Sequence, residues 1–242
     1  MAAGSVWTIG DVHGQGRMLE ALLGGLPRRD DDTTVFLGDY IDRGPDSAGV
    51  VRRVLDEHEA APERTVLLWG NHEDLAAEHF DLPAPSGYRY DPYDWFRNGG
   101  IAALESFGLS RPELFTADCP PELGRLFDLL QLFWRSPDPE LAPYLWVHAG
   151  VPPGQTPETA PPDTLVWIRE EFLNVHDPSG RIVIHGHTPF QEVRVRADKI
   201  GIDTGAAYGG VLTALLLPER RIFQADARGR VIEAELPPPE EG

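Results

Sequence analysis

The sequence predicts an α/β fold with mixed sheets, and three observations lead to that prediction. Short apolar runs that end at a glycine or another small residue recur along the chain. Segments with the apolar spacing of amphipathic helices separate the early runs, as in strand–helix–strand units. Near the C-terminus, three strand-like segments follow one another with tight turns between them. We therefore expect parallel strands early in the chain and antiparallel strands at its end.

Five apolar runs are predicted to be buried strands, at residues 6–9, 34–37, 66–69, 144–147 and 182–184. Each run is short and bounded by turn residues, which is typical of strands covered on both faces. A polar residue that can bind a metal or a proton lies close behind every run. Since such residues meet at one edge of an open sheet, we expect them to form a single site.

Helices are predicted at residues 16–26, 47–58 and 122–132, and later strands at 209–217, 221–225 and 230–236. Residues 81–110 are rich in proline, glycine and aromatic residues, so we expect an irregular or helical insertion that caps the site. Its aromatic side chains either pack the core or lid, or bind substrate. We expect one domain over residues 1–236 and a disordered tail at 237–242.

The composition limits the cellular compartment in which the protein could act and the partners that it could bind. The 242 residues carry a net charge of −18 and a single cysteine, Cys119, which cannot form an intramolecular disulfide. No apolar run approaches the roughly 18 residues that cross a membrane, and the first nine residues do not resemble a signal peptide. We expect a cytoplasmic protein that binds neither nucleic acid nor membranes, because both are anionic. A phosphorylated substrate would need local positive charge, which bound metal ions supply.

Six side chains at the ends of the predicted strands form a candidate two-metal site: Asp11, His13, Asp39, Asn71, His148 and His187. Asp11 and His13 are two residues apart on an extended segment, so their side chains share one side. The Asp39 carboxylate has enough lone pairs to bridge two cations about 3.5–4 Å apart. Asp11, His13 and Asp39 would bind one ion, and Asp39 would bind the other together with Asn71, His148 and His187.

The donor types indicate which metal to expect. An Asp-x-His pair alone is more often a turn or a surface feature, and the case for a site depends on the joint pattern. Carboxylate and imidazole donors together suit manganese, iron, zinc or nickel better than calcium. We expect two divalent ions, with manganese as the first choice.

These motifs resemble the metallophosphoesterases, and within them the bacterial and phage branch of the phosphoprotein phosphatase family of serine/threonine phosphatases. The signature blocks are Gly-Asp-Val-His-Gly (10–14), Gly-Asp-Tyr-Ile-Asp-Arg-Gly (38–44), Gly-Asn-His-Glu (70–73), His-Ala-Gly (148–150), Gly-His-Thr-Pro (186–189) and residues 202–210. The resemblance covers residues 5–216. It implies a calcineurin-like β-sandwich of two mixed sheets flanked by helices, with both metals at one edge.

The resemblance also implies roles for residues that do not bind metal. His72 would protonate the leaving oxygen, and Asp42 would bond to His72 and raise its proton affinity. Arg43 would clamp phosphate oxygens with its planar guanidinium, unless it pairs with Asp46 instead. Arg169 would be a second phosphate-binding arginine.

Three further residues leave alternatives open. Arg169 has neighbouring glutamates, Glu170 and Glu171, with which it could pair instead. Trp69 stands where many protein phosphatases carry an arginine, so that arm of the clamp is missing or another residue such as Arg97 replaces it. His185, two residues before His187, is expected to lie behind the metal ligands.

The implied activity is hydrolysis of phosphate monoesters by a hydroxide held between the metals, with phosphoserine or phosphothreonine proteins as first-choice substrates and small phosphoesters as others. One alternative is a bis(5'-nucleosyl)-tetraphosphatase-like hydrolase of dinucleoside polyphosphates. Asp42 favours the first, because relatives that cleave diadenosine tetraphosphate look as if they carry alanine there. The aromatic segment at 95–100 and Trp69 support the second. A non-catalytic metal-binding module is a third hypothesis, against which the complete set of donors argues.

Overall fold

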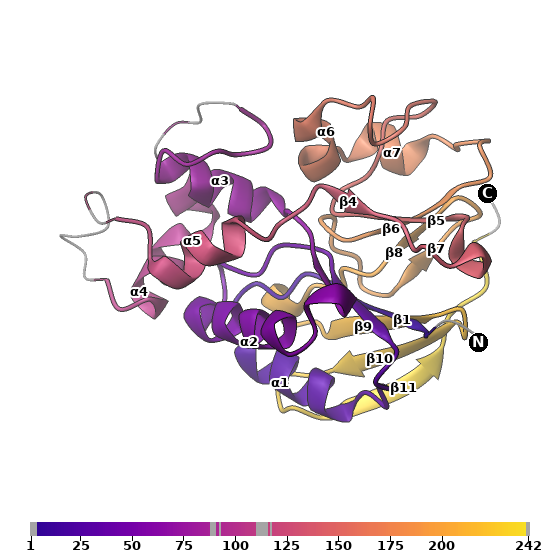
Figure 1. Cartoon of the computed structure of the whole chain (residues 1–242), viewed down its shortest axis with the longest axis horizontal. Coiled ribbons are helices and arrows are strands. Elements are labelled where there is room, and N and C mark those ends of the chain that lie inside the picture. Colours follow the sequence, from indigo (N-terminus) through magenta and orange to yellow (C-terminus); the bar gives the residue numbers. More distant parts are fainter. Residues whose placement is uncertain (1–3, 88–90, 92, 110–115, 117, 241–242) are drawn as a thin grey trace.

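Two β-sheets pack face to face in the computed structural model, which describes residues 4–87, 91, 93–109, 116 and 118–240 (Figure 1). The six-stranded sheet contains, in spatial order, β11 (Val231–Glu235), β10 (Arg221–Ala225), β9 (Leu212–Leu217), β1 (Val6–Ile9), β2 (Thr33–Phe36) and β3 (Thr65–Leu67). The five-stranded sheet contains β4 (Phe133–Trp134), β5 (Tyr144–Val147), β6 (Ile182–His185), β8 (Lys199–Gly201) and β7 (Arg194–Val195). The predicted pair of mixed sheets is confirmed.

The strand pairing explains the early and late patterns of the sequence. Strands β1, β2 and β3 are parallel, and α1 (Gly16–Gly25) and α2 (Ser47–Ala60) make the two crossovers between them. Strand β9 returns antiparallel to β1, and β10 and β11 continue as an antiparallel meander. In the second sheet, β5, β6 and β8 are parallel. The carboxyl ends of β1, β2 and β3 therefore open at one edge of the first sheet.

The remaining helices are α3 (Asn71–His79), α4 (Ile101–Ser106), α5 (Pro121–Phe127), α6 (Pro162–Trp167) and α7 (Glu170–Asn174). A π-helical turn at Phe96–Gly100 runs directly into α4, and short 3₁₀ turns occupy Pro62–Arg64, Pro139–Leu141 and Ala206–Tyr208. Within the described part of the chain, every helix is too short or too polar to cross a membrane.

Alternating side chains divide the core into layers. In β1, Val6 belongs to the apolar cluster shared by the two sheets, whereas Trp7 and Ile9 belong to the cluster that includes the inner faces of α1 and α2. Figure 1 shows α1 and α2 along the six-stranded sheet and α6 and α7 beside the five-stranded sheet. Between the sheets, the indole N–H of Trp146 donates to Thr8 Oγ1 at 2.7 Å, which satisfies a buried polar pair.

Two predicted boundaries differ from the structure by more than two residues. Helix α5 ends at Phe127 and not at residue 132, because residue 131 joins the edge of the first sheet: Gln131 donates to the Leu67 carbonyl, and Trp69 donates back to Gln131. Strand β9 begins at Leu212 and not at residue 209, because the chain first turns through Gly209, whose φ is +85°. The periodicity of the sequence showed neither the pairing of Gln131 with β3 nor the turn at Gly209.

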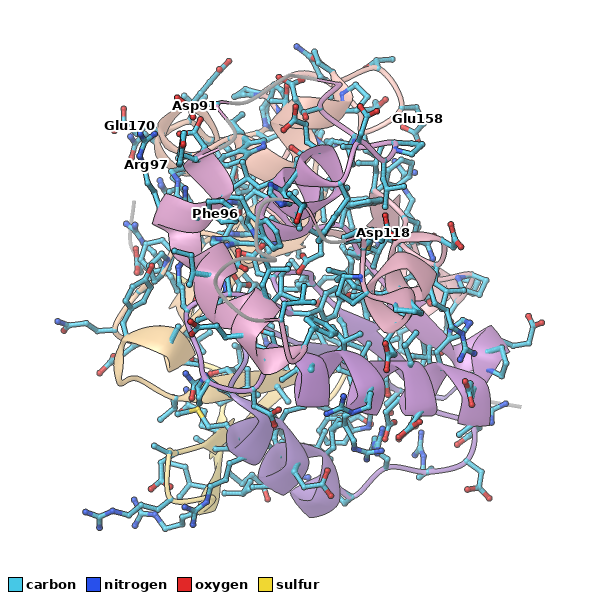
Figure 2. All side chains as sticks on the ribbon, turned by 90° about the vertical axis from the view of Figure 1, so that its left-hand side faces the viewer. Asp91, Phe96, Arg97, Asp118, Glu158 and Glu170 are labelled. Carbon is cyan, nitrogen blue, oxygen red and sulfur yellow. The ribbon has the colours of Figure 1, made fainter. Side chains whose placement is uncertain are left out.

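The predicted insertion at 81–110 includes residues 88–90, 92 and 110, which lie outside the described residues, as do residues 241–242 of the predicted tail. Its described part contains the π-helical turn and α4. Figure 2 looks onto this side of the molecule, where Arg97 reaches the outer edge and pairs with Asp94 at 3.0 Å. Toward the C-terminus, the Glu240 N–H donates to the Val195 carbonyl at 2.8 Å.

Candidate active site

All six predicted metal ligands are buried and lie where the parallel strands end or just beyond. Asp11 and His13 follow β1, Asp39 follows β2, Asn71 begins α3 after β3, and His148 and His187 follow β5 and β6. Ligand atoms of two groups lie within 4.8 Å of one another: His13, Asp39 and His72, and Asp39, His148 and His187. Both groups share Asp39. The structure thus brings together residues up to 176 positions apart in the chain.

The backbone of these loops is strained where the side chains converge. Among the described residues, seven non-glycine residues have positive φ, and five of them are in the site: His13, Asp39, Asp42, Arg43 and His187. Left-handed φ costs energy for residues with a Cβ, and such strain concentrates at functional sites. The loops also approach closely, because a Cβ on Gly38 would lie 2.6 Å from the Gly70 nitrogen. This approach explains why the motifs contain glycine.

Hydrogen bonds set the tautomers of two histidines. Nδ1 of His13 lies 2.9 Å from the Ile41 carbonyl, and Nδ1 of His148 lies 2.8 Å from the Leu37 carbonyl. A carbonyl only accepts, so each Nδ1 carries the proton and each Nε2 keeps a lone pair. His13 Nε2 is 3.3 Å from Asp39 Oδ2, and His148 Nε2 is 3.5 Å from Asp39 Oδ1. Both lone pairs are therefore directed toward the shared carboxylate, as metal ligands require.

The Asn71 carbonyl oxygen meets two imidazole nitrogens. Its Oδ1 lies 3.1 Å from His148 Nε2 and 2.8 Å from His187 Nδ1. With the proton of His148 on Nδ1, its Nε2 and Asn71 Oδ1 are two acceptors that face each other. Such converging lone pairs fit a shared cation.

Three buried carboxylates, Asp11, Asp39 and Asp203, lie near one another. Burial raises the pKa of Asp11 well above its usual value, and Asp203 and Asp39 raise it further. Burial also raises the pKa of Asp203 to about 6. Asp11 Oδ2 accepts the His187 N–H at 2.8 Å, whereas its buried Oδ1 has no hydrogen-bond partner among the described residues. Uncompensated buried charge of this kind fits divalent cations.

Four histidines surround the central carboxylate. Burial raises the pKa of Asp39, but His148, His72, His13 and His187 outweigh it, so the pKa lies well below the usual value. Burial lowers the pKa of His13 and His187, which favours their neutral form. An ionised carboxylate among neutral imidazoles is a donor set that divalent transition metals accept.

His72 and Asp42 form a short, fully buried pair, with Nδ1 of His72 2.5 Å from Asp42 Oδ2. Burial lowers the pKa of His72 to about 4 and raises that of Asp42 well above its usual value, so burial disfavours the charged form of each group. His72 Nε2 is buried without a hydrogen-bond partner among the described residues. One nitrogen of His72 lies within 4.8 Å of ligand atoms of His13 and Asp39, so the imidazole can either exchange a proton with substrate or add a ligand.

Two arginines supply positive charge at the site. Arg43 contacts His13 Nε2 and stacks 5.3 Å from the Tyr208 ring, whereas Asp46, its alternative partner, caps α2 by accepting from Gly49. Arg169 donates to Thr188 Oγ1 at 3.4 Å, and its charge lowers the pKa of His187. Both guanidinium groups therefore lie close to the candidate metal ligands.

Two other predicted features have structural partners. Trp69, which stands at the arginine position of many protein phosphatases, is buried and stacks on Phe127 with ring centroids 5.6 Å apart. His185 is buried, and its ring meets the Phe172 ring edge-on with centroids 5.0 Å apart, while its Nδ1 lies 3.1 Å from the Gly186 carbonyl.

Sequence reasoning missed two supporting carboxylates. Glu73, buried at the first turn of α3, accepts the backbone N–H groups of Asp39 and Tyr40 at 2.8 and 2.9 Å. It therefore holds the loop that presents Asp39. Asp203 belongs to the block at residues 202–210, and its carboxylate lies close enough to Asp11 to raise the pKa of that group. Nothing local to either residue showed which loop or charge it would meet.

A two-sheet sandwich with carboxylate, imidazole and amide donors gathered at one edge defines a metal-dependent phosphoester hydrolase. The chain belongs to the calcineurin-like phosphoesterase family, whose model matches residues 4–191. It is therefore a metallophosphoesterase, as the motifs implied. The donor set fits divalent metal ions.

Several relatives are similar over almost their whole length. Serine/threonine-protein phosphatase 1 of Salmonella typhimurium is 32% identical, with 86% of this chain and 89% of that protein aligned. The symmetrical bis(5'-nucleosyl)-tetraphosphatase of Bordetella parapertussis is 27% identical, with 93% and 96% aligned. The solved cold-active protein-tyrosine phosphatase of a Shewanella species has a TM-score of 0.59 at 18% identity, covering 96% of this chain and 80% of that one. This structural likeness concerns the fold alone.

Proposed function

We propose that the chain hydrolyses phosphoserine and phosphothreonine monoesters with two divalent cations, manganese first and iron, zinc or nickel as alternatives. Asp11, His13 and Asp39 would hold one ion, and Asp39, Asn71, His148 and His187 the other. When bound, the cations polarise phosphate oxygens and acidify water. The converging lone pairs and buried carboxylates support this assignment.

The observation that carries the substrate class is the 2.5 Å contact between His72 and Asp42. A seryl or threonyl oxygen leaves as a strongly basic alkoxide and needs a proton, whereas a nucleotide leaves from an anhydride as a stable anion. A buried acid pair therefore benefits a monoesterase more than an anhydride hydrolase.

In the proposed reaction, the pair enters with two protons and presents Nε2–H of His72 to the leaving oxygen. After that proton is transferred, Asp42 and Nδ1 share the remaining one, so the pair ends one proton poorer. Arg43 and Arg169 would hold phosphate oxygens by charge-assisted hydrogen bonds. Water finally restores the lost proton.

One observation favours a second candidate, a dinucleoside polyphosphate hydrolase. A pocket of about 460 Å³ is lined by Pro189, Phe190, Gln191, Thr204, Gly205, Tyr208 and Gly210. Its Tyr208 wall touches Arg43, so the pocket adjoins the proposed phosphate clamp. Flat apolar walls suit a nucleobase, because every base can stack on an aromatic ring.

We further propose a single catalytic domain over residues 1–236, with 81–110 as its cap. In the described part of the tail that was predicted to be disordered, residues 237–240, the Glu240 N–H donates to the Val195 carbonyl. The acidic charge and the single cysteine support action in the cytoplasm on phosphoproteins or small phosphoesters.

The deciding experiment is hydrolysis by metal-stripped protein after manganese is restored, with a phosphoserine/phosphothreonine peptide and diadenosine tetraphosphate as competing substrates. Faster turnover of the peptide is the expected result. Faster turnover of the dinucleotide would replace the proposed substrate class with the second candidate. If neither substrate is hydrolysed while metal is bound, either the proposed substrate class or the catalytic role itself is wrong.

A further inference from the structure

Trp95 joins the insertion to the proposed acid pair. Its indole Nε1 lies 2.9 Å from Asp42 Oδ2 and 3.0 Å from Oδ1, so one N–H donates to both oxygens of the carboxylate. Trp95 is 2% exposed and Asp42 is fully buried, so bulk solvent does not reach these hydrogen bonds. The two residues are 53 positions apart, and only the folded insertion brings them together.

The surroundings hold the indole in this position. A Cβ on Gly100 would lie 2.6 Å from the Trp95 ring, and one on Gly99 would lie 2.5 Å from the Arg43 nitrogen. The π-helical turn therefore packs directly against Trp95 and against the loop that carries Asp42 and Arg43. On another side, the ring packs against His79 and Phe80 at the end of α3, with centroids 4.9 and 5.6 Å away. Helix α3 also carries His72 in its first turn.

The carboxylate of Asp42 is thus bonded from two directions, by the indole and by His72 Nδ1. A rotation of the carboxylate that broke the indole bonds would also turn Oδ2 away from the imidazole. We propose that Trp95 is a positioning residue for phosphate ester hydrolysis, because it orients Asp42 and, through Asp42, directs His72 Nε2 toward the leaving oxygen. This inference rests on the acid role of His72 proposed above.

The electrostatics agree with that geometry. Burial raises the pKa of Asp42, and the indole hydrogen bond lowers it, so Trp95 favours the ionised carboxylate. Trp95 belongs to the insertion at 81–110. Through Trp95, the insertion would therefore help to orient the acid pair as well as cap the site.

The test compares Trp95→Phe with Trp7→Phe in the full-length, manganese-loaded protein. Trp7 is a matched control: it is 1% exposed, and its indole donates to the Asp32 carboxylate at 3.0 Å near the start of β1. The measured quantity is the ratio of kcat on a phosphoserine peptide to kcat on nitrophenyl phosphate, whose leaving group needs no proton. General acids contribute on the order of 100- to 10,000-fold, so losing the orientation should reduce this ratio about tenfold.

We expect Trp95→Phe to lower the ratio and Trp7→Phe to keep it within about twofold of the wild type. In a His72→Asn background, Trp95→Phe should lower the ratio no further, because the two residues act through one step. Equal losses on both substrates, or an additional loss in that background, would overturn the positioning role.

A His72→Asn variant alone separates this inference from the function beneath it. If His72→Asn lowers the ratio and Trp95→Phe does not, only the inference fails. If His72→Asn leaves the ratio unchanged, the acid role fails, and the inference with it.

A second measurement needs neither turnover nor metal. In ¹⁵N-labelled metal-free protein, the indole N–H signal of Trp95 should shift when Asp42→Asn replaces the carboxylate, while the Trp7 signal stays in place. An unmoved Trp95 signal would overturn the proposal even if Trp95→Phe folded poorly.

Discussion

Nδ1 of His72 lies 2.5 Å from Oδ2 of Asp42, and both side chains are shielded from solvent. This contact predicts that His72→Asn reduces turnover of alkyl phosphates far more than turnover of nitrophenyl phosphate. The selective loss should be on the order of 100-fold, since only the poor leaving group needs the proton. Steady-state kinetics on both esters measure it. Equal losses would contradict the acid role.

Asp39 is the carboxylate common to both groups of candidate ligands. Asp39→Asn keeps the shape but removes the charge, and we expect the protein to retain fewer than two metal ions. Mutation of a residue that only supports a metal ligand lowers metal affinity by about 10- to 100-fold. Mutation of a ligand shared by both ions should lower metal affinity further. Elemental analysis after dialysis gives the stoichiometry. Asp31→Asn, which alters an exposed carboxylate, is the control and should keep the wild-type count.

Arg43 has the planar guanidinium that a phosphate clamp needs, and it contacts His13 at the site. Arg43→Ala should weaken competitive inhibition by inorganic phosphate about 10- to 100-fold for each charge-assisted bond lost. Arg43→Lys should restore only part of the binding, because an ammonium cannot bind two oxygens in a fork. Arg97→Ala is the control, since Arg97 is exposed and pairs with Asp94. Unchanged inhibition in Arg43→Ala would argue against the clamp.

Phe190 lines the pocket next to the proposed clamp, whereas Tyr208 both lines it and touches Arg43. If the pocket holds a nucleobase, Phe190→Ala should raise the KM for diadenosine tetraphosphate about tenfold, the lower end of base-stacking energies. The KM for nitrophenyl phosphate, which has no base, should stay within about twofold. A dinucleotide KM that does not change would remove the observation that favours the second candidate.

Asp32 is a buried carboxylate that ties the start of β1 to the loop before β2. Burial raises its pKa, but bonds from Arg29, Trp7 and Ser5 outweigh burial, so the pKa lies below the usual value. A depressed pKa stabilises the fold above the unfolded pKa of about 3.9, and this stabilisation is lost as the pH falls through the folded pKa. Asp32→Asn should therefore destabilise the protein by about 1–3 kcal/mol at pH 7.

The pH series tests the sign of that effect. Urea unfolding from pH 7 to pH 3 should show a constant difference between wild type and Asp32→Asn above about pH 5, shrinking below about pH 4. A difference that is independent of pH would show that the stabilisation comes from shape and not from charge.

The sequence by itself determined the strand ends and the residues that follow them. Apolar runs, turn residues and donors are adjacent in the chain, so Asp11, Asp39 and Asn71 could be assigned to one sheet edge from local pattern alone. The mixed sheets could be predicted for the same reason. That these donors bind two metals stays a prediction that the assays above address.

Only the tertiary structure decided which distant groups surround that edge. Trp95 reaches Asp42 across 53 residues, Asp203 joins the buried carboxylates, and Gln131 ends its helix early by pairing with β3. Each contact depends on how separate segments pack, and neither propensity nor spacing within one segment carries that information. The candidate metal ligands can therefore be recognised in the sequence, whereas the residues that orient the site can be recognised only in the folded structure.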